Sequence, residues 1–228
     1  MHQAFLIALG SIMAAIALAI AWQLTGRTRL RATERGAYLD AVLALFSDVQ
    51  TRLTPSGFAR MAGRAGGLSY DLQVVPDTLT FRKLPALWVL VTQTEPLPLT
   101  ATLDLMMRPT LLEPFSNFRQ LDHEIALPAG FPADAALRCD IPGAMPPETL
   151  LASQSDLFAD PGIKELILSP KGLRVVFLAE QADRTAYLLF RDAEMGRQPL
   201  NPARIAPLLT RLATLRLTIL RHYGAPDA

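Results

Sequence analysis

The chain has 228 residues, half of them apolar, and a formal net charge of +1. This near-neutral balance gives no basic field for nucleic acid, so we expect no nucleic-acid partner. The single cysteine, Cys139, excludes an intramolecular disulfide and is typical of a reducing compartment.

An uncharged apolar stretch occupies the beginning of the chain, from Ala4 to Trp22. As a helix it would extend about 28 Å, close to the thickness of a bilayer core. Trp22, at its end, suits the level of the lipid headgroups. We therefore predict a transmembrane anchor over residues 1–26, with the lipid bilayer as a partner of a single-pass membrane protein.

Four arginines follow this stretch, whereas the residues before it carry no Lys or Arg: Arg27, Arg29, Arg31 and Arg35. The positive-inside rule then predicts a C-terminal domain in the cytoplasm, at the plasma (inner) membrane, with these arginines next to the bilayer. A cleaved signal peptide is the alternative, because residues 19–21 form a small-x-small pattern. The absent basic n-region and the length of the run favour an uncleaved signal-anchor.

Small residues recur along the predicted anchor, several of them at four-residue spacing: Gly10, Ser11, Ala14, Ala15 and Ala19. Small residues at this spacing allow two membrane helices to approach closely. We predict that they form a face for association with a membrane-protein partner or a second copy. The alternative is that alanine is simply common in an apolar segment.

Residues 27–66 are predicted to be a juxtamembrane amphipathic helical region. One apolar stripe recurs there at three- and four-residue spacing: Leu39, Val42, Leu43, Phe46, Val49 and Leu53. The turn residues 54–57 end this helix, and residues 58–65 are predicted to form a short second one.

Residues 67–228 are predicted to form an α+β domain, either as one unit or as two lobes, 67–143 and 144–228. Periodicity and turn residues predict strands at 68–75, 79–84, 87–94, 99–107, 121–127, 136–141, 165–168, 173–179 and 187–191. In the strand 99–107, Thr100, Thr102 and Asp104 alternate with apolar residues, which predicts one solvated face. A central helix is predicted to end at Phe158, and a long C-terminal helix to span 201–223.

The fold class predicted from these elements is α+β. A single N-terminal transmembrane helix precedes a mainly antiparallel β domain, which carries an N-terminal amphipathic helix, one central helix and the long C-terminal helix.

Ionisable residues are most concentrated at Asp122-His123-Glu124. Neighbours in a strand point to opposite faces, so we predict no metal site there. His123 and Cys139 could form a nucleophilic pair, but a lone cysteine is more often a small buried apolar residue.

A second cluster contains Arg191, Asp192 and Glu194. Paired carboxylates can perform acid–base catalysis only where they converge in a cleft, and a surface ion pair is the simpler interpretation. We predict no catalytic, cofactor-binding or metal-binding residue.

Three functions remain. The first is a non-enzymatic interaction or assembly module in a membrane-associated complex. The second is a lipid- or small-ligand-binding domain, in which Phe115, Phe118 and Phe131 cover an apolar cavity. The third is a hydrolase, whose residues would be Asp192, Glu194, His123 and Arg191.

Overall fold

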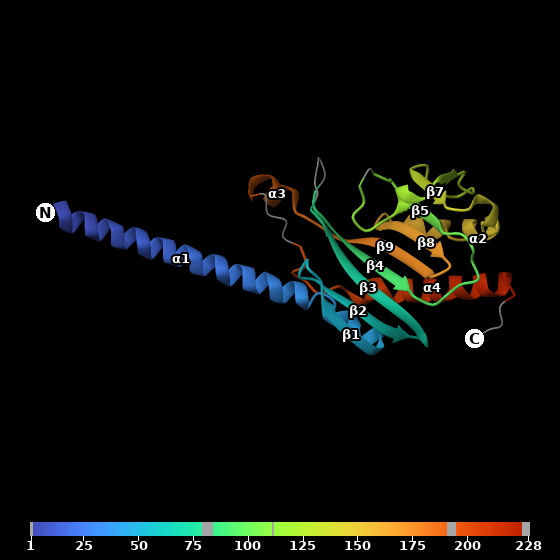
Figure 1. Ribbon diagram of the computed structural model, residues 1–228, viewed down its shortest axis with the longest axis horizontal. Coiled ribbons are helices and arrows are strands. Elements are labelled where there is room, and N and C mark those ends of the chain that lie inside the picture. The colour runs from blue at the N-terminus through green and yellow to red at the C-terminus, as the bar shows by residue number, and fades with distance from the viewer. Residues whose placement is uncertain (1, 79–83, 111, 191–194, 225–228) are drawn as a thin grey trace.

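The computed structural model describes residues 2–78, 84–110, 112–190 and 195–224, with the side chains of 2–9, 11, 24, 186, 189 and 190 also left aside. A curved sheet forms the body of the molecule, and helix α4 (Pro202–His222) lies along one of its faces (Figure 1). Helix α1 (His2–Gly36) extends away from this body (Figure 1).

The sheet contains nine strands in the order β1-β2-β3-β4-β9-β8-β5-β7-β6, and every neighbouring pair is antiparallel. The strands are β1 (Ser47–Leu53), β2 (Ala59–Ala65), β3 (Leu68–Asp77), β4 (Ala86–Gln93), β5 (Leu103–Met107), β6 (His123–Ile125), β7 (Ala135–Cys139), β8 (Ile163–Ser169) and β9 (Gly172–Gln181). The mainly antiparallel domain that the sequence predicts is therefore confirmed.

The centre of the sheet contains the strands with the longest apolar runs. β4 pairs with β9 from Ala86 to Gln93, as expected of a strand whose two faces are both covered. The predicted hairpin of β8 and β9 is also present, closed at Gly172. Its backbone has φ +135°, and a Cβ there would lie 2.0 Å from the Gln93 carbonyl oxygen, so this close approach requires glycine.

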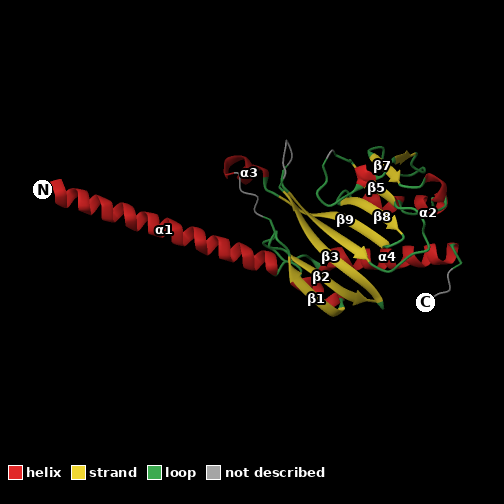
Figure 2. Cartoon of the chain, in the orientation of Figure 1, coloured by secondary structure: helices red, strands yellow, loops and turns green. Residues whose placement is uncertain are grey.

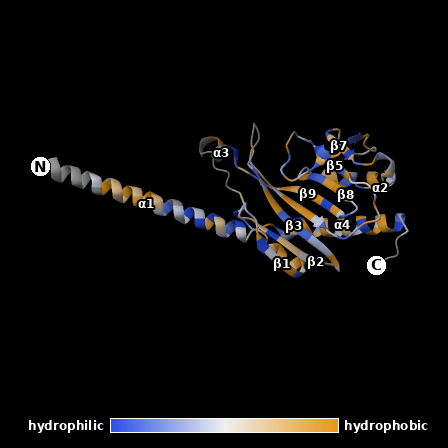
Figure 3. Ribbon diagram, in the orientation of Figure 1, coloured by the Kyte–Doolittle hydropathy of each residue, from blue (hydrophilic) through white to orange (hydrophobic). Residues whose placement is uncertain are grey.

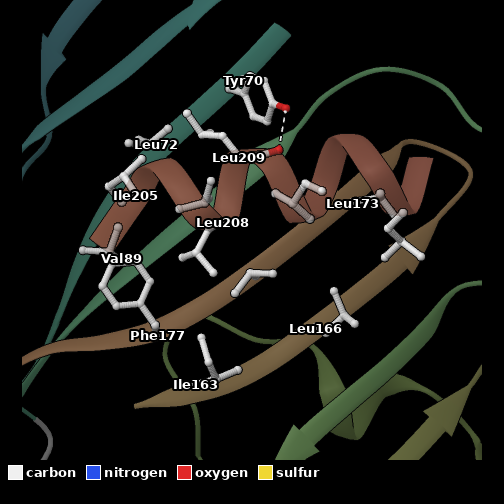
Figure 4. Packing of buried hydrophobic residues seen from close by; sticks show 14 of the residues in the cluster. Tyr70, Leu72, Val89, Ile163, Leu166, Leu173, Phe177, Ile205, Leu208 and Leu209 are labelled. Carbon is white, nitrogen blue, oxygen red and sulfur yellow. Dashed lines mark hydrogen bonds between the residues drawn. The ribbon is translucent and has the colours of Figure 1, made fainter. Parts of the chain in front are cut away.

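Helix α4 confirms the predicted C-terminal helix. Asn201 caps its first turn by accepting a hydrogen bond from the Ala203 backbone N–H at 2.9 Å, and Pro202 occupies the first position. The predicted stripe is buried against the sheet: Ile205, Leu208, Leu209, Leu212, Leu215 and Ile219. Figure 4 shows Ile205 and Leu208 facing Val89 and Phe177 of the central strands.

The predicted transmembrane helix is wrong. Among the described residues, no helix is both long enough and apolar enough to cross a membrane. α1 is one continuous helix, in which Gln23, Thr25 and the arginines follow Trp22. The predicted membrane localisation and cytoplasmic orientation depended on that span, so the same finding contradicts them.

The predicted amphipathic helix is also wrong beyond Gly36. A 3-10 helix, η1 (Asp40–Leu45), carries the first part of the apolar stripe, and its Val42 is fully buried. Phe46 follows η1, and Val49 and Leu53 lie in strand β1, which pairs with β2 where the second short helix was expected. Val49, Thr51 and Leu53 also alternate with period two, and pairing at the sheet edge favours that period over the helical one.

The strand predicted at 187–191 is wrong as well, because helix α3 (Arg184–Phe190) occupies the described part of it (Figure 2). The central helix is shorter than predicted: α2 (Glu148–Ala152) is followed by the 3-10 helix η4 (Ser155–Ala159). The strand predicted at 99–107 is reduced to β5. The strand predicted at 79–84 lies almost wholly outside the described residues.

Two further 3-10 helices, η2 (Phe118–Gln120) and η3 (Pro142–Ala144), lie in the connections around β6 and β7. The sheet continues across the boundary between the two predicted lobes, because β8 and β9 lie between β4 and β5. The division of the chain into domains stays a prediction.

Candidate functional site

The predicted association residues lie on α1 and face solvent. Gly10, Ala14, Ala15 and Ala19 are all exposed, whereas the side chain of Ser11 lies outside the described part. Large apolar side chains surround them and are also exposed: Ile12, Met13, Ile16, Leu18, Ile20 and Trp22. Figure 3 shows this apolar part of α1 far from the sheet and a more polar part next to it.

The four arginines predicted to lie at a bilayer occupy the end of α1 that meets the sheet domain. Arg27 and Arg29 are exposed, and Arg31 is half-buried. Arg35 is half-buried too, and its guanidinium lies 5.4 Å from the centre of the Phe58 ring. A cation over an aromatic face is attracted to it, so Arg35 helps to fasten α1 to the domain.

The structure brings one predicted chemical pair together. His123 and Cys139 are cross-strand partners in β6 and β7, yet His123 is exposed while Cys139 is fully buried. Burial raises the pKa of the Cys139 thiol, which disfavours the nucleophilic thiolate. Arg191, Asp192 and Glu194 lie outside the described residues.

The three phenylalanines proposed as lid residues pack against other side chains. Phe115 and Phe118 are buried beside Leu90, Met106 and Val176 on the sheet face opposite α4, and the Phe115 ring centre is 5.0 Å from that of Trp88. The Phe131 ring packs against that of Phe158, with 5.6 Å between the two ring centres. The segment that carries Phe115 and Phe118 therefore covers part of the sheet.

Sequence reasoning missed a row of mainly polar and charged side chains on this covered face. Cross-strand pairing aligns one residue from each of six strands: Thr92, Arg174, Ile167, Asp104, Arg138 and Glu124. Arg174 donates from Nε to Thr92 Oγ1 at 3.0 Å, and the Arg138 and Glu124 side chains approach to 3.8 Å. The predicted solvated face is therefore wrong within β5, whose five residues are all buried, Asp104 at 2% exposure.

A second buried carboxyl lies close to Asp104. Glu165 on β8 is fully buried, and its strand partner is Met106, two residues from Asp104. Burial raises the pKa of Asp104 well above its usual range, and the negative charge of Glu165 raises it further. Burial also raises the pKa of Glu165, to about 7. Asp104 Oδ2 accepts from Ser116 Oγ at 3.4 Å, while Oδ1 has no hydrogen-bond partner among the described residues.

A buried ion pair fixes the segment over this face. Lys164 Nζ lies 2.9 Å from Glu113 Oε1 and donates to the carbonyl oxygens of Met107 and Arg108, both at 2.7 Å. The Thr110 backbone N–H and hydroxyl donate to the same Glu113 oxygen. Paired charges with further hydrogen bonds are the form in which buried ions are tolerated.

These contacts leave two candidate functional features, the exposed helix α1 and the charged row with its carboxyl pair. Within the described ranges, no group of three or more His, Cys, Asp or Glu residues is placed to hold a metal ion. Comparisons with known proteins found no matching family, no similar curated protein and no similar solved structure.

Proposed function

We propose that the chain is a non-enzymatic interaction module that assembles through helix α1, with α1 of a second copy as its partner. One observation carries the proposal: the large apolar side chains of the sheet domain are mostly buried, whereas those of α1 are exposed. Leu18 is 72% exposed and Trp22 is 80% exposed.

An apolar surface of this kind favours association. Burying one large apolar side chain stabilises a complex by about 1.5–3 kcal/mol, and contiguous exposed patches generally mark interaction sites. α1 has 35 residues and is about 52 Å long. Most helical stability in proteins comes from packing, so a partner along α1 would also stabilise the helix itself.

The small residues favour a second α1 as that partner. Gly10 with Ala14, and Ala15 with Ala19, are each four residues apart, which places the members of each pair on one side of the helix. A partner backbone can approach closely over such positions, and large neighbours such as Ile16 can then pack beside it. Because α1 extends away from the sheet, a second helix can lie along it without meeting the domain (Figure 1).

Sedimentation velocity of the full-length chain over a range of concentrations tests this function. We expect a discrete oligomer whose affinity falls at least tenfold in the double variant Ala15→Leu/Ala19→Leu, because two added side chains block the close approach. Ala32→Leu, at an exposed alanine in the polar part of the same helix, is the matched control and should leave the affinity unchanged. A monomer at all concentrations, or equal behaviour of the variant and its control, would contradict the proposal.

A further inference from the structure

A cavity of about 300 Å³ lies beside the middle of the charged row, where Arg174, Ile167 and Asp104 line it. Thr102 and Asp104 of the β5 region, Ile167 of β8, Lys171 and Arg174 of the β8–β9 hairpin, and Asn117 of the covering segment are among its lining residues. Its volume is at the lower end of the range for small-molecule sites. The cavity is separate from α1, so its role is independent of assembly.

The cavity contains more positive than negative charge. Arg174 and Lys171 are cations, while Asp104 holds its proton to higher pH than an ordinary aspartate because it is buried beside Glu165. The hydroxyl of Thr102 and the amide of Asn117 add neutral hydrogen-bonding groups. This combination favours an anion over a cation.

The strand register fixes the distance between the cationic Arg174 and the buried carboxyl of Asp104. Asp104 and Arg174 are both partners of Ile167, so one strand separates them and their Cα atoms lie about 10 Å apart. Thr92 holds the Arg174 guanidinium through its Nε, which leaves the fork of terminal nitrogens suited to a planar or tetrahedral oxyanion. The buried Asp104 side chain lines the cavity on the other side of Ile167.

We propose that this cavity binds a small hydroxylated organic anion, whose carboxylate or phosphate group contacts Arg174 and Lys171 and whose hydroxyl group reaches Asp104. The aliphatic side chain of Ile167 lies beneath the carbon skeleton. A divalent cation would instead meet Arg174 and Lys171, whose charges repel it.

Titration calorimetry of the full-length chain tests the site with two probes, malate for the carboxylate and glycerol 3-phosphate for the phosphate. We expect saturable binding of at least one probe, and the probe that binds identifies the acidic group. Arg174→Met should lower the affinity at least tenfold, and Lys171→Met, at an exposed position in the β8–β9 turn, should lower it less. The matched control is Arg52→Met, on the edge strand β1, which should leave binding unchanged.

The pH dependence of anion binding distinguishes a specific site from a surface that attracts anions only through its positive charge. The charged groups facing Asp104 are Glu165 on β8, Arg174 on β9 and Arg138 on β7. We expect anion binding to weaken as the pH rises and the buried Asp104 carboxyl, whose pKa is raised by burial, ionises. Asp104→Asn, which stays neutral and keeps the shape, should reduce that weakening.

Three results would overturn the proposal. They are the absence of saturable binding by both probes at millimolar concentration, unchanged affinity in Arg174→Met, and an unaltered pH dependence in Asp104→Asn.

Discussion

The two faces of the sheet are stabilised by different kinds of interaction. The face under α4 is a continuous apolar cluster in which Leu72, Val89, Phe177 and Leu212 are almost completely buried. The opposite face has a smaller apolar cluster beside Asp104, Glu165 and Arg174, under a segment with little regular structure.

The difference separates the source of stability from the source of pH dependence. Burial of apolar surface is non-directional, so the face under α4 can stabilise the fold without depending on pH or on single contacts. The face under the segment that carries Phe115 and Phe118 depends on paired charges, and each partner left unpaired there is costly. We therefore expect the stability of the chain to come mainly from the first face, and its response to pH and ligands from the second.

The largest expected effect comes from truncating the face under α4. Phe177→Ala removes a fully buried ring and should lower the free energy of unfolding by about 3–5 kcal/mol. Phe115→Ala, 7% exposed on the other face, should cost less than Phe177→Ala, because its site lies at a smaller cluster that can relax. Urea denaturation measures both values. An equal or larger loss in Phe115→Ala would contradict the comparison.

The next effect concerns the ion pair on the opposite face. Glu113→Ala removes the carboxylate that lies 2.9 Å from the buried Lys164 ammonium, and it should destabilise the fold by about 3 kcal/mol. The exposed pair of Arg108 and Asp134, 3.6 Å apart, provides the control. Asp134→Ala should change the free energy of unfolding by less than about 1 kcal/mol, because solvent screens that pair. Similar losses in the two variants would show that burial of the first pair has no energetic consequence.

The smallest effect is on the pH dependence of stability. Folded Glu165 holds its proton up to about pH 7, whereas the unfolded chain releases it near 4.5, so the folded state binds the additional proton between these values. Stability from this group is therefore complete below about pH 4.5 and is lost as the pH rises to about 7, at up to about 1.4 kcal/mol per pH unit.

Glu165→Gln cannot ionise, so it should match the native chain at low pH and exceed its stability by about 1–3 kcal/mol above pH 7. Chemical denaturation across this pH range measures the difference. A variant that is less stable than the native chain at high pH would show that the ionised Glu165 is well accommodated.

Local periodicity was sufficient for the elements whose pattern is long and unambiguous. The stripe from Ile205 to Ile219 predicts α4, and the apolar run within Ala86–Gln93 predicts a strand covered on both faces. Val49 and Leu53 satisfy both a helical and an alternating pattern, and only the neighbouring strand decides between them. A sequence alone contains no information on that neighbour.

Local periodicity could not predict the site on the opposite face, because that site also depends on which strands are neighbours. Asp104 and Glu165 are distant in the chain, and so are Glu113 and Lys164. Their proximity depends on the register of β5 with β8, which no local pattern specifies. The alternation in residues 99–107 identified the polar side of the strand, but not the segment that covers it.

The position of β9 in the sheet has a consequence for synthesis of the chain. Thr92 of β4 and Arg174 of β9 are hydrogen-bonded although they lie 82 residues apart in the chain. The edge of β4 that pairs with β9 therefore stays unpaired while the intervening residues are synthesised. Open strand edges pair readily with other chains, and α4, which covers the apolar face, follows β9 in the chain. The nascent chain therefore stays vulnerable to aggregation at least until β9 and α4 have been made.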